Sequence, residues 1–117
     1  LVVDNEPAVL QATHTLLTRW GHRALLAANG AAALDLVRQH DFDLALVDHQ
    51  LDAGENGLLL IEQWRACGRA PRALTMISAD RSGEFLKAAA AARVPVLHKP
   101  VKPAALRALL ASVRLDV

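Results

Sequence analysis

Residues 44 to 51 read Leu-Ala-Leu-Val-Asp-His-Gln-Leu and form the most informative segment of the chain. Four consecutive apolar residues are followed directly by an acid, Asp48. An apolar run without alternation is typical of a strand that is buried on both faces, as in a parallel sheet with helices on each side. The segment therefore predicts a central parallel strand that ends in a carboxylate.

On both sides of this segment, short β-type runs alternate with helix-type runs. The expected strands are Leu1 to Val3, Arg23 to Ala27, Leu44 to Val47, Ala73 to Ile77 and Pro95 to His98. The expected helices are Pro7 to Trp20, Ala31 to Gln39, Leu58 to Ala66, Gly83 to Arg93 and Pro103 to Val113. This alternation predicts an α/β fold, a doubly wound, flavodoxin-like five-stranded parallel sheet in the order 2-1-3-4-5.

The composition is that of one compact domain. The chain has 117 residues, of which 53% are hydrophobic, so we expect a single domain over residues 1–117. A formal charge of +1, with acids and bases mixed, gives no basic face for direct nucleic-acid binding. The uncharged apolar stretch Ala24 to Leu34 is too short to span a membrane.

Two further features concern the setting of the chain. The lone Cys67 lies in an apolar helical pattern, which predicts a buried free thiol and a cytoplasmic, reducing environment. The sequence opens inside a strand-like run without Met, so we expect a domain excised from a longer protein.

Polar groups follow four of the predicted strands. They are Asp4-Asn5-Glu6 after the first strand, Asp48 after the third, Ser78-Ala79 after the fourth and His98-Lys99-Pro100 after the fifth. Each residue alone has an ordinary structural explanation, because polar residues commonly follow strands. Together they would meet at the carboxyl edge of the sheet, where open α/β folds bind ligands.

With these residues the chain resembles the receiver domains of response regulators over nearly its whole length. The resemblance rests on the motifs Leu-Val-Val-Asp-Asn-Glu-Pro at 1–7, Leu-Val-Asp-His-Gln-Leu at 46–51, Ile-Ser-Ala-Asp at 77–80 and His-Lys-Pro-Val at 98–101. It implies that Asp48 is the phosphoacceptor, that Ser78 supplies the switch hydroxyl and that Lys99 holds the phosphoryl group. Among such domains, the motifs look like those at the carboxyl end of hybrid sensor histidine kinases.

The resemblance also implies an Mg²⁺ site made of Asp4, Asn5, Asp48 and the backbone carbonyl of Gln50. The family usually has Asp where this chain has Asn5, so one negative charge is lost and weaker Mg²⁺ binding is expected. The resemblance further implies a cis peptide bond before Pro100.

Three other positions match sites where the family tunes its response. Val96 stands where the family usually has an aromatic switch residue, so coupling between the site and the output surface is expected to be weaker or differently built. Gln50 and Asp80, two positions beyond Asp48 and Ser78, are where the family controls dephosphorylation. The five histidines show no metal-ligand spacing and are expected on the surface or in loops.

The expected function is that of a two-component phosphorelay receiver, which accepts a phosphoryl group from phosphohistidine and switches a protein-interaction surface. The donor would be a histidine kinase or phosphotransfer protein, including kinase domains of the same parent chain. Output, or a dimer, is expected through the face made by the fourth helix, fifth strand and fifth helix. Apart from self-phosphorylation and autodephosphorylation, no enzymatic activity is expected.

Two alternatives remain open from the sequence. One is a receiver-like interaction domain that works without phosphorylation, which Asn5 and Val96 would fit. The other, weaker, is a flavodoxin-like ligand-binding enzyme, although no Gly-rich phosphate loop follows the first strand.

Overall fold

The structure is a computed structural model that describes residues 1–51 and 54–113. Five strands alternate with five helices along this part of the chain. In order they are β1 (Val2–Val3), α1 (Pro7–Arg19), β2 (Leu26–Ala27), α2 (Gly30–Gln39), β3 (Leu44–Asp48), α3 (Gly57–Ala66), β4 (Ala73–Ser78), α4 (Gly83–Ala91), β5 (Val96–His98) and α5 (Pro103–Ser112).

The strands form one parallel sheet in the order β2-β1-β3-β4-β5, which confirms the predicted topology. The longest ladder joins β3 to β4, where Leu44 pairs with Ala73 and Asp48 with Ile77. β1 pairs with β3 so that Val3 lies beside Val47, which brings the residues after β1 next to the end of β3. All strand ends that carry polar residues therefore lie along one edge.

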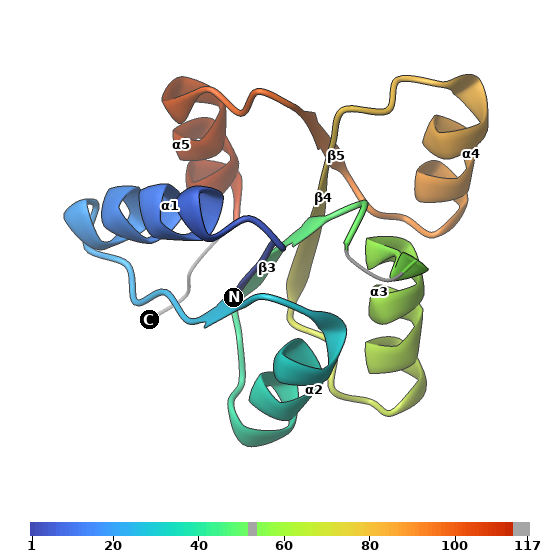
Figure 1. The fold of residues 1–117 in the computed structure, drawn as a ribbon, viewed down its shortest axis with the longest axis horizontal. Coiled ribbons are helices and arrows are strands. Elements are labelled where there is room, and N and C mark those ends of the chain that lie inside the picture. The colour runs from blue at the N-terminus through green and yellow to red at the C-terminus, as the bar shows by residue number, and fades with distance from the viewer. Residues whose placement is uncertain (52–53, 114–117) are drawn as a thin grey trace.

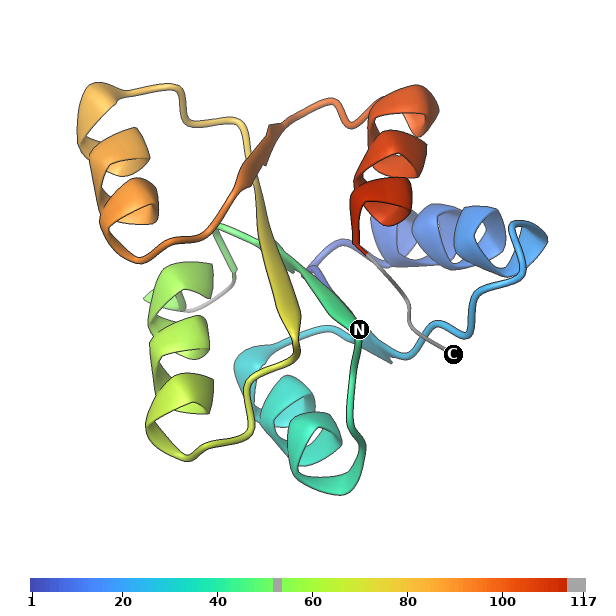
Figure 2. The same ribbon diagram turned by 180° about the vertical axis from the view of Figure 1, so that it is seen from behind.

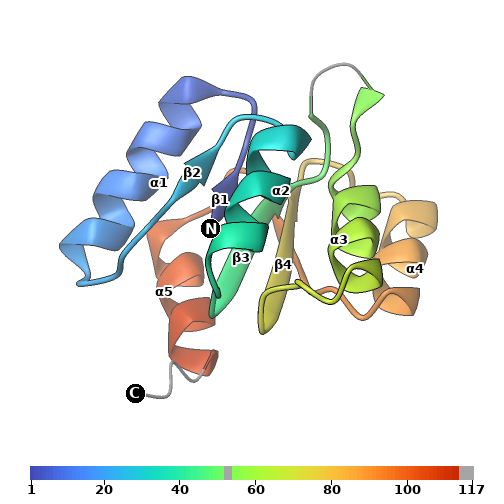
Figure 3. The ribbon, with the colours of Figure 1, turned by 90° about the horizontal axis from the view of Figure 1, so that it is seen from below.

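Helices cover both faces of the sheet (Figure 1). α1 and α5 pack on one face, and α2, α3 and α4 pack on the other, as the view from below shows (Figure 3). On the first face α1 and α5 lie side by side (Figure 2), and the Arg107 guanidinium of α5 sits 5.5 Å from the ring centroid of Trp20 at the end of α1.

Each face has its own apolar cluster. Leu10 and Leu17 of α1 pack with Leu106 of α5 and with Leu46 of β3. The larger cluster on the other face includes Trp64, which is fully buried, together with apolar residues of α2, α4 and the central strands. β3 is buried at all five positions, as the unbroken apolar run predicts.

The helix starts follow from local chemistry. Pro7 and Pro103 open α1 and α5, where proline has no hydrogen bond to lose. The side chains of Asn29, Asn56 and Ser82 accept hydrogen bonds from the free N–H groups of α2, α3 and α4. Turn-forming residues therefore place the helices where the apolar pattern needs them.

Two sequence expectations are wrong in detail. Cys67 is exposed, because it caps the end of α3 after the last residue of the buried stripe. The strand expected over Arg23 to Ala27 is confined to Leu26–Ala27, since its partner β1 is only two residues long. No helix in the described part of the chain has both the length and the apolar character needed to cross a bilayer.

Candidate functional site at the carboxyl edge of the sheet

The polar residues predicted from the strand ends gather at one edge. Asp4 directly follows β1, Asp48 ends β3, Ser78 ends β4 and Lys99 directly follows β5. Asp4, Asp48 and Ser78 are all buried, which is uncommon for polar side chains and calls for partners around them. The sheet register therefore brings together groups that are distant in sequence.

Lys99 and Asp48 form the ion pair at the centre of the site. Lys99 Nζ lies 3.1 Å from Asp48 Oδ1, with the carboxylate side chain 5% exposed and the lysine side chain 30% exposed. The peptide bond between Lys99 and Pro100 is cis. From the distance and the two exposures, the Lys99 ammonium group contacts a buried carboxylate and also remains in contact with water.

The pKa of Asp48 is raised above the ordinary aspartate value. Burial is the largest cause, and the negative charge of Asp4 raises it further, while the hydrogen bond and the charge of Lys99 and the N–H of Gln50 act in the opposite direction. Two neighbouring carboxylates in a buried place attract positive charge, so the site is suited to a cation near Asp4 and Asp48.

The groups beside the ion pair shape a small hollow of about 260 Å³. Asp4 is held by the N–H of Glu6, which donates to Asp4 Oδ1 at 2.9 Å. The next residue, Asn5, is half-buried and lines the hollow together with Asp48, Ser78 and Lys99. The hollow is open to small polar groups and contains an acid, a hydroxyl and an amine.

Ser78 is fixed at the end of β4 by hydrogen bonds on both sides. Its carbonyl accepts from the Lys99 N–H at 2.9 Å, and its hydroxyl accepts from the Asp80 N–H at 2.9 Å. Asp80 in turn accepts from the Ser82 N–H at 2.8 Å, and this hydrogen bond lowers the pKa of Asp80. The segment after β4 is therefore well defined.

His49 is a residue of the site that sequence reasoning missed, since it was expected to be an ordinary loop histidine. Its Nδ1 lies 3.1 Å from Ser78 Oγ, and its ring stacks on Phe85 of α4 with the centroids 4.1 Å apart. The signal available in the sequence was its place directly after Asp48, which puts it at the same edge as Ser78.

The loop after Asp48 is anchored on α2. The Glu55 carboxylate accepts from the Gly30 N–H at the start of that helix, at 3.1 and 3.3 Å, where the helix dipole favours an anion. Gln50, expected to tune the site, is exposed and pairs with Asn56 through an isolated bridge. Asp52 and Ala53 of this loop lie outside the described residues.

The donor set fits Mg²⁺. Among residues 1–51 and 54–113, no group of three or more His, Cys, Asp or Glu side chains could hold a metal ion. Mg²⁺ does not need such a group, because it keeps several waters and takes one or two carboxylates with other oxygen ligands. Asp4 and Asp48, two buried carboxylates whose charges already disfavour one another, meet this requirement.

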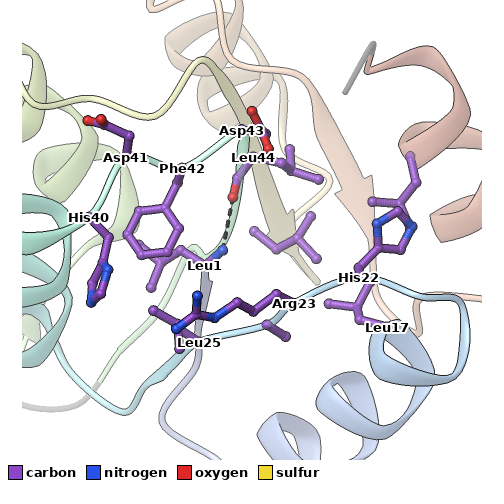
Figure 4. A pocket seen from close by; sticks show the side chains of 13 residues that line it. Leu1, Leu17, His22, Arg23, Leu25, His40, Asp41, Phe42, Asp43 and Leu44 are labelled. Atoms are coloured by element: carbon purple, nitrogen blue, oxygen red, sulfur yellow. Dashed lines mark hydrogen bonds between the residues drawn. The ribbon is translucent and has the colours of Figure 1, made fainter. Parts of the chain in front are cut away.

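Two other hollows lie mostly outside this site. One of about 260 Å³ lies at the amino ends of β1 and β3, where the Leu1 nitrogen donates to the Leu44 carbonyl at 2.9 Å (Figure 4). None of the predicted site residues lines it. A larger one of about 590 Å³ lies between α1 and α5 and touches the site only through Glu6 and the Lys99–Pro100 pair.

Replacing Asp48 by Asn should stabilise the metal-free domain by about 1 kcal/mol at pH 7, because it removes a buried anion that Asp4 repels. Lys99 is partly exposed and stays hydrated without its partner. The raised pKa of Asp48 means that the folded state binds this proton more tightly than the unfolded chain does. The gain should therefore shrink as the pH falls through that pKa towards 3.8, the ordinary value.

Urea denaturation in EDTA at pH 7 and at pH 4 measures this difference. A lower stability of Asp48→Asn at pH 7 would mean that the pairing with Lys99 outweighs the cost of burying the carboxylate.

The comparisons with known proteins agree with this geometry. Residues 1–111 match the family model of the response regulator receiver domain. The chain is 34% identical to the sensory/regulatory protein RpfC of Xanthomonas campestris over 116 residues, which is 95% of this chain and 16% of RpfC. It is 37% identical to the sensor histidine kinase GacS of Pseudomonas protegens over 68 residues, covering 56% of this chain and 7% of GacS.

Solved structures show the same fold. The chemotaxis protein CheY4 of Vibrio cholerae superposes with a TM-score of 0.87 at 23% identity, covering 96% of this chain and 94% of that one. A CheY-like receiver domain protein from Methanospirillum hungatei gives a TM-score of 0.84 at 25% identity, with 95% and 88% covered. With the sheet order and the matched family model, the chain belongs to the response regulator receiver domain family of two-component signalling.

Proposed function

We propose that this domain accepts a phosphoryl group from phosphohistidine onto Asp48 and thereby switches a protein-interaction surface. The observation that carries the proposal is the buried Asp48 carboxylate with Lys99 Nζ at 3.1 Å, beside Asp4 and the Ser78 hydroxyl. An amine, a hydroxyl and a second acid around one buried carboxylate suit a reaction in which negative charge accumulates.

The chain's own residues supply most of what the transfer needs. Asp48 is the nucleophile: its oxygen forms a new P–O bond while the P–N bond of the donor breaks, and the electron pair of that bond stays on the donor imidazole. The Lys99 ammonium group, paired with the free carboxylate at rest, would pair with the phosphoryl oxygens, and the Ser78 hydroxyl can donate a hydrogen bond to one of them. No strongly activated nucleophile is needed, because phosphohistidine is itself a reactive donor.

Asp4, Asn5, Asp48 and the backbone carbonyl of Gln50 would hold Mg²⁺. When bound, the ion supplies positive charge that offsets the approach of an anionic phosphoryl group to an anionic carboxylate. The Asp4 carboxylate is held in place by the hydrogen bond from the Glu6 N–H, and its burial shields it from bulk water.

The output surface in this proposal is formed by α4, β5 and α5. Leu86 of α4 is 39% exposed, while Phe85 next to it is buried. Leu86 thus offers an apolar side chain to a partner, and Phe85 connects the same helix to the core. It could serve a partner protein or a second copy of the chain. Gln50 and Asp80 flank the site and would set the access of water to the phosphorylated Asp48.

The parent protein and its partners are part of the proposal. The chain spans 16% of the length of RpfC and 7% of GacS. We infer that this domain is one module of a longer signalling protein, with a histidine kinase or phosphotransfer protein, in the same chain or another, as the donor.

Intact mass after incubation with acetyl phosphate and Mg²⁺ tests the function. The expected result is one phosphoryl adduct on the wild type and none on Asp48→Asn. A wild type without an adduct, also after incubation with a phosphorylated histidine kinase, would favour an interaction domain that works without phosphorylation.

Asn5→Asp should tighten Mg²⁺ binding by about 1 kcal/mol, or roughly fivefold, because it restores a full charge at a metal ligand. Isothermal titration of both proteins measures the difference. The matched control is Asn29→Asp, which adds the same charge at the exposed start of α2 and should leave the affinity unchanged. Equal affinities of the wild type and Asn5→Asp would exclude Asn5 as a ligand.

A further inference from the structure

His49 contacts both the switch hydroxyl and the helix next to it. Its Nδ1 lies 3.1 Å from Ser78 Oγ, and its ring stacks on Phe85 with an interplanar angle of 30°. Phe85 belongs to α4 and is 6% exposed, so the stack is made against a residue that packs in the core. One side chain therefore joins the end of β4 to α4.

The position of His49 is fixed by its backbone. Its N–H donates to the Ile77 carbonyl at 2.8 Å, and its carbonyl accepts from the Gly57 N–H at 2.9 Å. These bonds tie His49 to β4 on one side and to the start of α3 on the other. These bonds hold the backbone of His49 at the place from which its imidazole contacts Ser78.

The hydroxyl of Ser78 has a single proton to donate. Because there is one proton, donation to His49 Nδ1 and donation to a phosphoryl oxygen exclude each other. The hydroxyl oxygen also accepts a hydrogen bond from the Asp80 N–H. If Nδ1 is instead the donor, the hydroxyl must still leave this contact to move towards Asp48. With either tautomer, the resting contact competes with the phosphorylated state.

The residue at position 96 makes this contact more significant. β5 carries Val96, which is half-buried against the same apolar cluster as Phe85 and has no ring to follow Ser78. In the part of the chain that the structure describes, the stacked rings of His49 and Phe85 lie beside the Ser78 hydroxyl. Coupling between the site and α4 therefore has a physical route through these two rings.

We propose that His49 is a positioning residue that holds the Ser78 hydroxyl in the unphosphorylated domain and transmits its release to α4 through the stack on Phe85. The inference rests on the proposed phosphorylation of Asp48. When the phosphoryl group draws Ser78 away, the imidazole loses its partner and the packing of α4 changes with it.

Two substitutions separate the two contacts. His49→Phe keeps a ring against Phe85 and removes the hydrogen-bonding nitrogen. His49→Asn keeps a hydrogen-bonding atom at the position of Nδ1 and removes the ring. Both proteins are compared with the wild type in the initial rate of phosphorylation by acetyl phosphate with Mg²⁺, followed by intact mass.

The expected rates differ between the variants. His49→Phe should accept the phosphoryl group roughly threefold to tenfold faster, because one hydrogen bond no longer competes for Ser78. His49→Asn should stay within about twofold of the wild type, since the competing hydrogen bond is kept. A rate of His49→Phe equal to that of the wild type would overturn the proposal.

The stack is tested by amide chemical shifts of Gly83–Ala91 when beryllium fluoride, a mimic of the phosphoryl group, is added with Mg²⁺. His49→Phe should keep the shift changes, and in His49→Asn they should fall to about half or less. Unchanged shifts in His49→Asn would overturn the coupling through Phe85.

A measurement on the wild type covers the case in which a variant fails to fold. With ¹⁵N-labelled histidine, the Nδ1 resonance of His49 should move on addition of beryllium fluoride towards its value in resting Ser78→Ala. An unmoved resonance would refute the proposal. If the wild type is phosphorylated and His49→Phe is phosphorylated at the same rate, this inference alone is refuted. If the wild type forms no phosphoryl adduct, the phosphorylation of Asp48 is refuted as well.

Discussion

Transfer of a phosphoryl group from acetyl phosphate to Asp48 should slow by about 100-fold when Lys99 is replaced by Met, the size of effect seen when one donor to a developing anion is removed. Lys99 Nζ lies 3.1 Å from the acceptor carboxylate and is the cation of the ion pair in the buried site. Met fills similar volume without a charge, so the loss reports on electrostatics more than on packing.

The effect of Lys99→Met should depend on pH. The hydrogen bond and charge of Lys99 lower the pKa of Asp48 against the stronger effect of burial. Without the lysine this pKa rises further, and a larger share of Asp48 is protonated and unable to attack as the pH falls. The ratio of wild-type to variant rate should therefore grow towards lower pH.

Lys102→Met is the matched control. It removes the same charge three residues further on, from an exposed side chain that makes no capping hydrogen bond at the start of α5. Its rate should equal that of the wild type. If Lys99→Met is folded and is phosphorylated at a rate within twofold of that of Lys102→Met, the ion pair has no role in the transfer.

Gly57→Ala should lower the free energy of unfolding by about 3 kcal/mol, because a methyl group is forced into a closely packed place. A Cβ on Gly57 would collide with the backbone carbonyl oxygen of Asp48, and it would lie 2.9 Å from Val47 Cγ1 and 3.0 Å from Met76 Sδ. Val47 and Met76 are fully buried in the central strands, and the Asp48 oxygen belongs to the backbone of β3, so little free space is open for relaxation.

Gly83→Ala is the control for the intrinsic effect of this change at a helix start. Both glycines are the first residue of a helix, but a Cβ on Gly83 would meet no atom within 4 Å. Alanine favours a helix over glycine by up to about 1 kcal/mol, so Gly83→Ala should be neutral or stabilising. Urea denaturation compares the two, and equal stabilities would mean that α3 can shift away from Asp48 at little cost.

The order of the elements could be predicted from the sequence because it depends on local patterns. The apolar run before Asp48 predicted a buried strand, and the helices expected to begin at Pro7, Leu58 and Pro103 begin within one residue of those positions. Such signals are contained in short windows of sequence and survive in the fold. The least accurate strand was the one begun at Arg23, whose length depends on its neighbour β1.

The site was predicted in its parts but not in its contacts. Asp4, Asp48, Ser78 and Lys99 were singled out because each stands at a strand end, and the sheet order brings those ends together. His49 was missed, since a histidine after a strand has no local feature that distinguishes a loop residue from one that reaches the neighbouring strand. The anchoring of Glu55 on Gly30 was missed for the same reason, because 25 residues separate the two.

The sequence alone thus determined the alternation of strands and helices, the parallel sheet and the chemical groups at its carboxyl edge. Apolar periodicity and turn residues act over a few positions, so a single chain reveals them. Only the tertiary structure decided that Lys99 reaches Asp48 and that His49 lies between Ser78 and Phe85. These contacts depend on strand register and on which side-chain conformations fit among buried neighbours, and that information is spread over the whole packed domain.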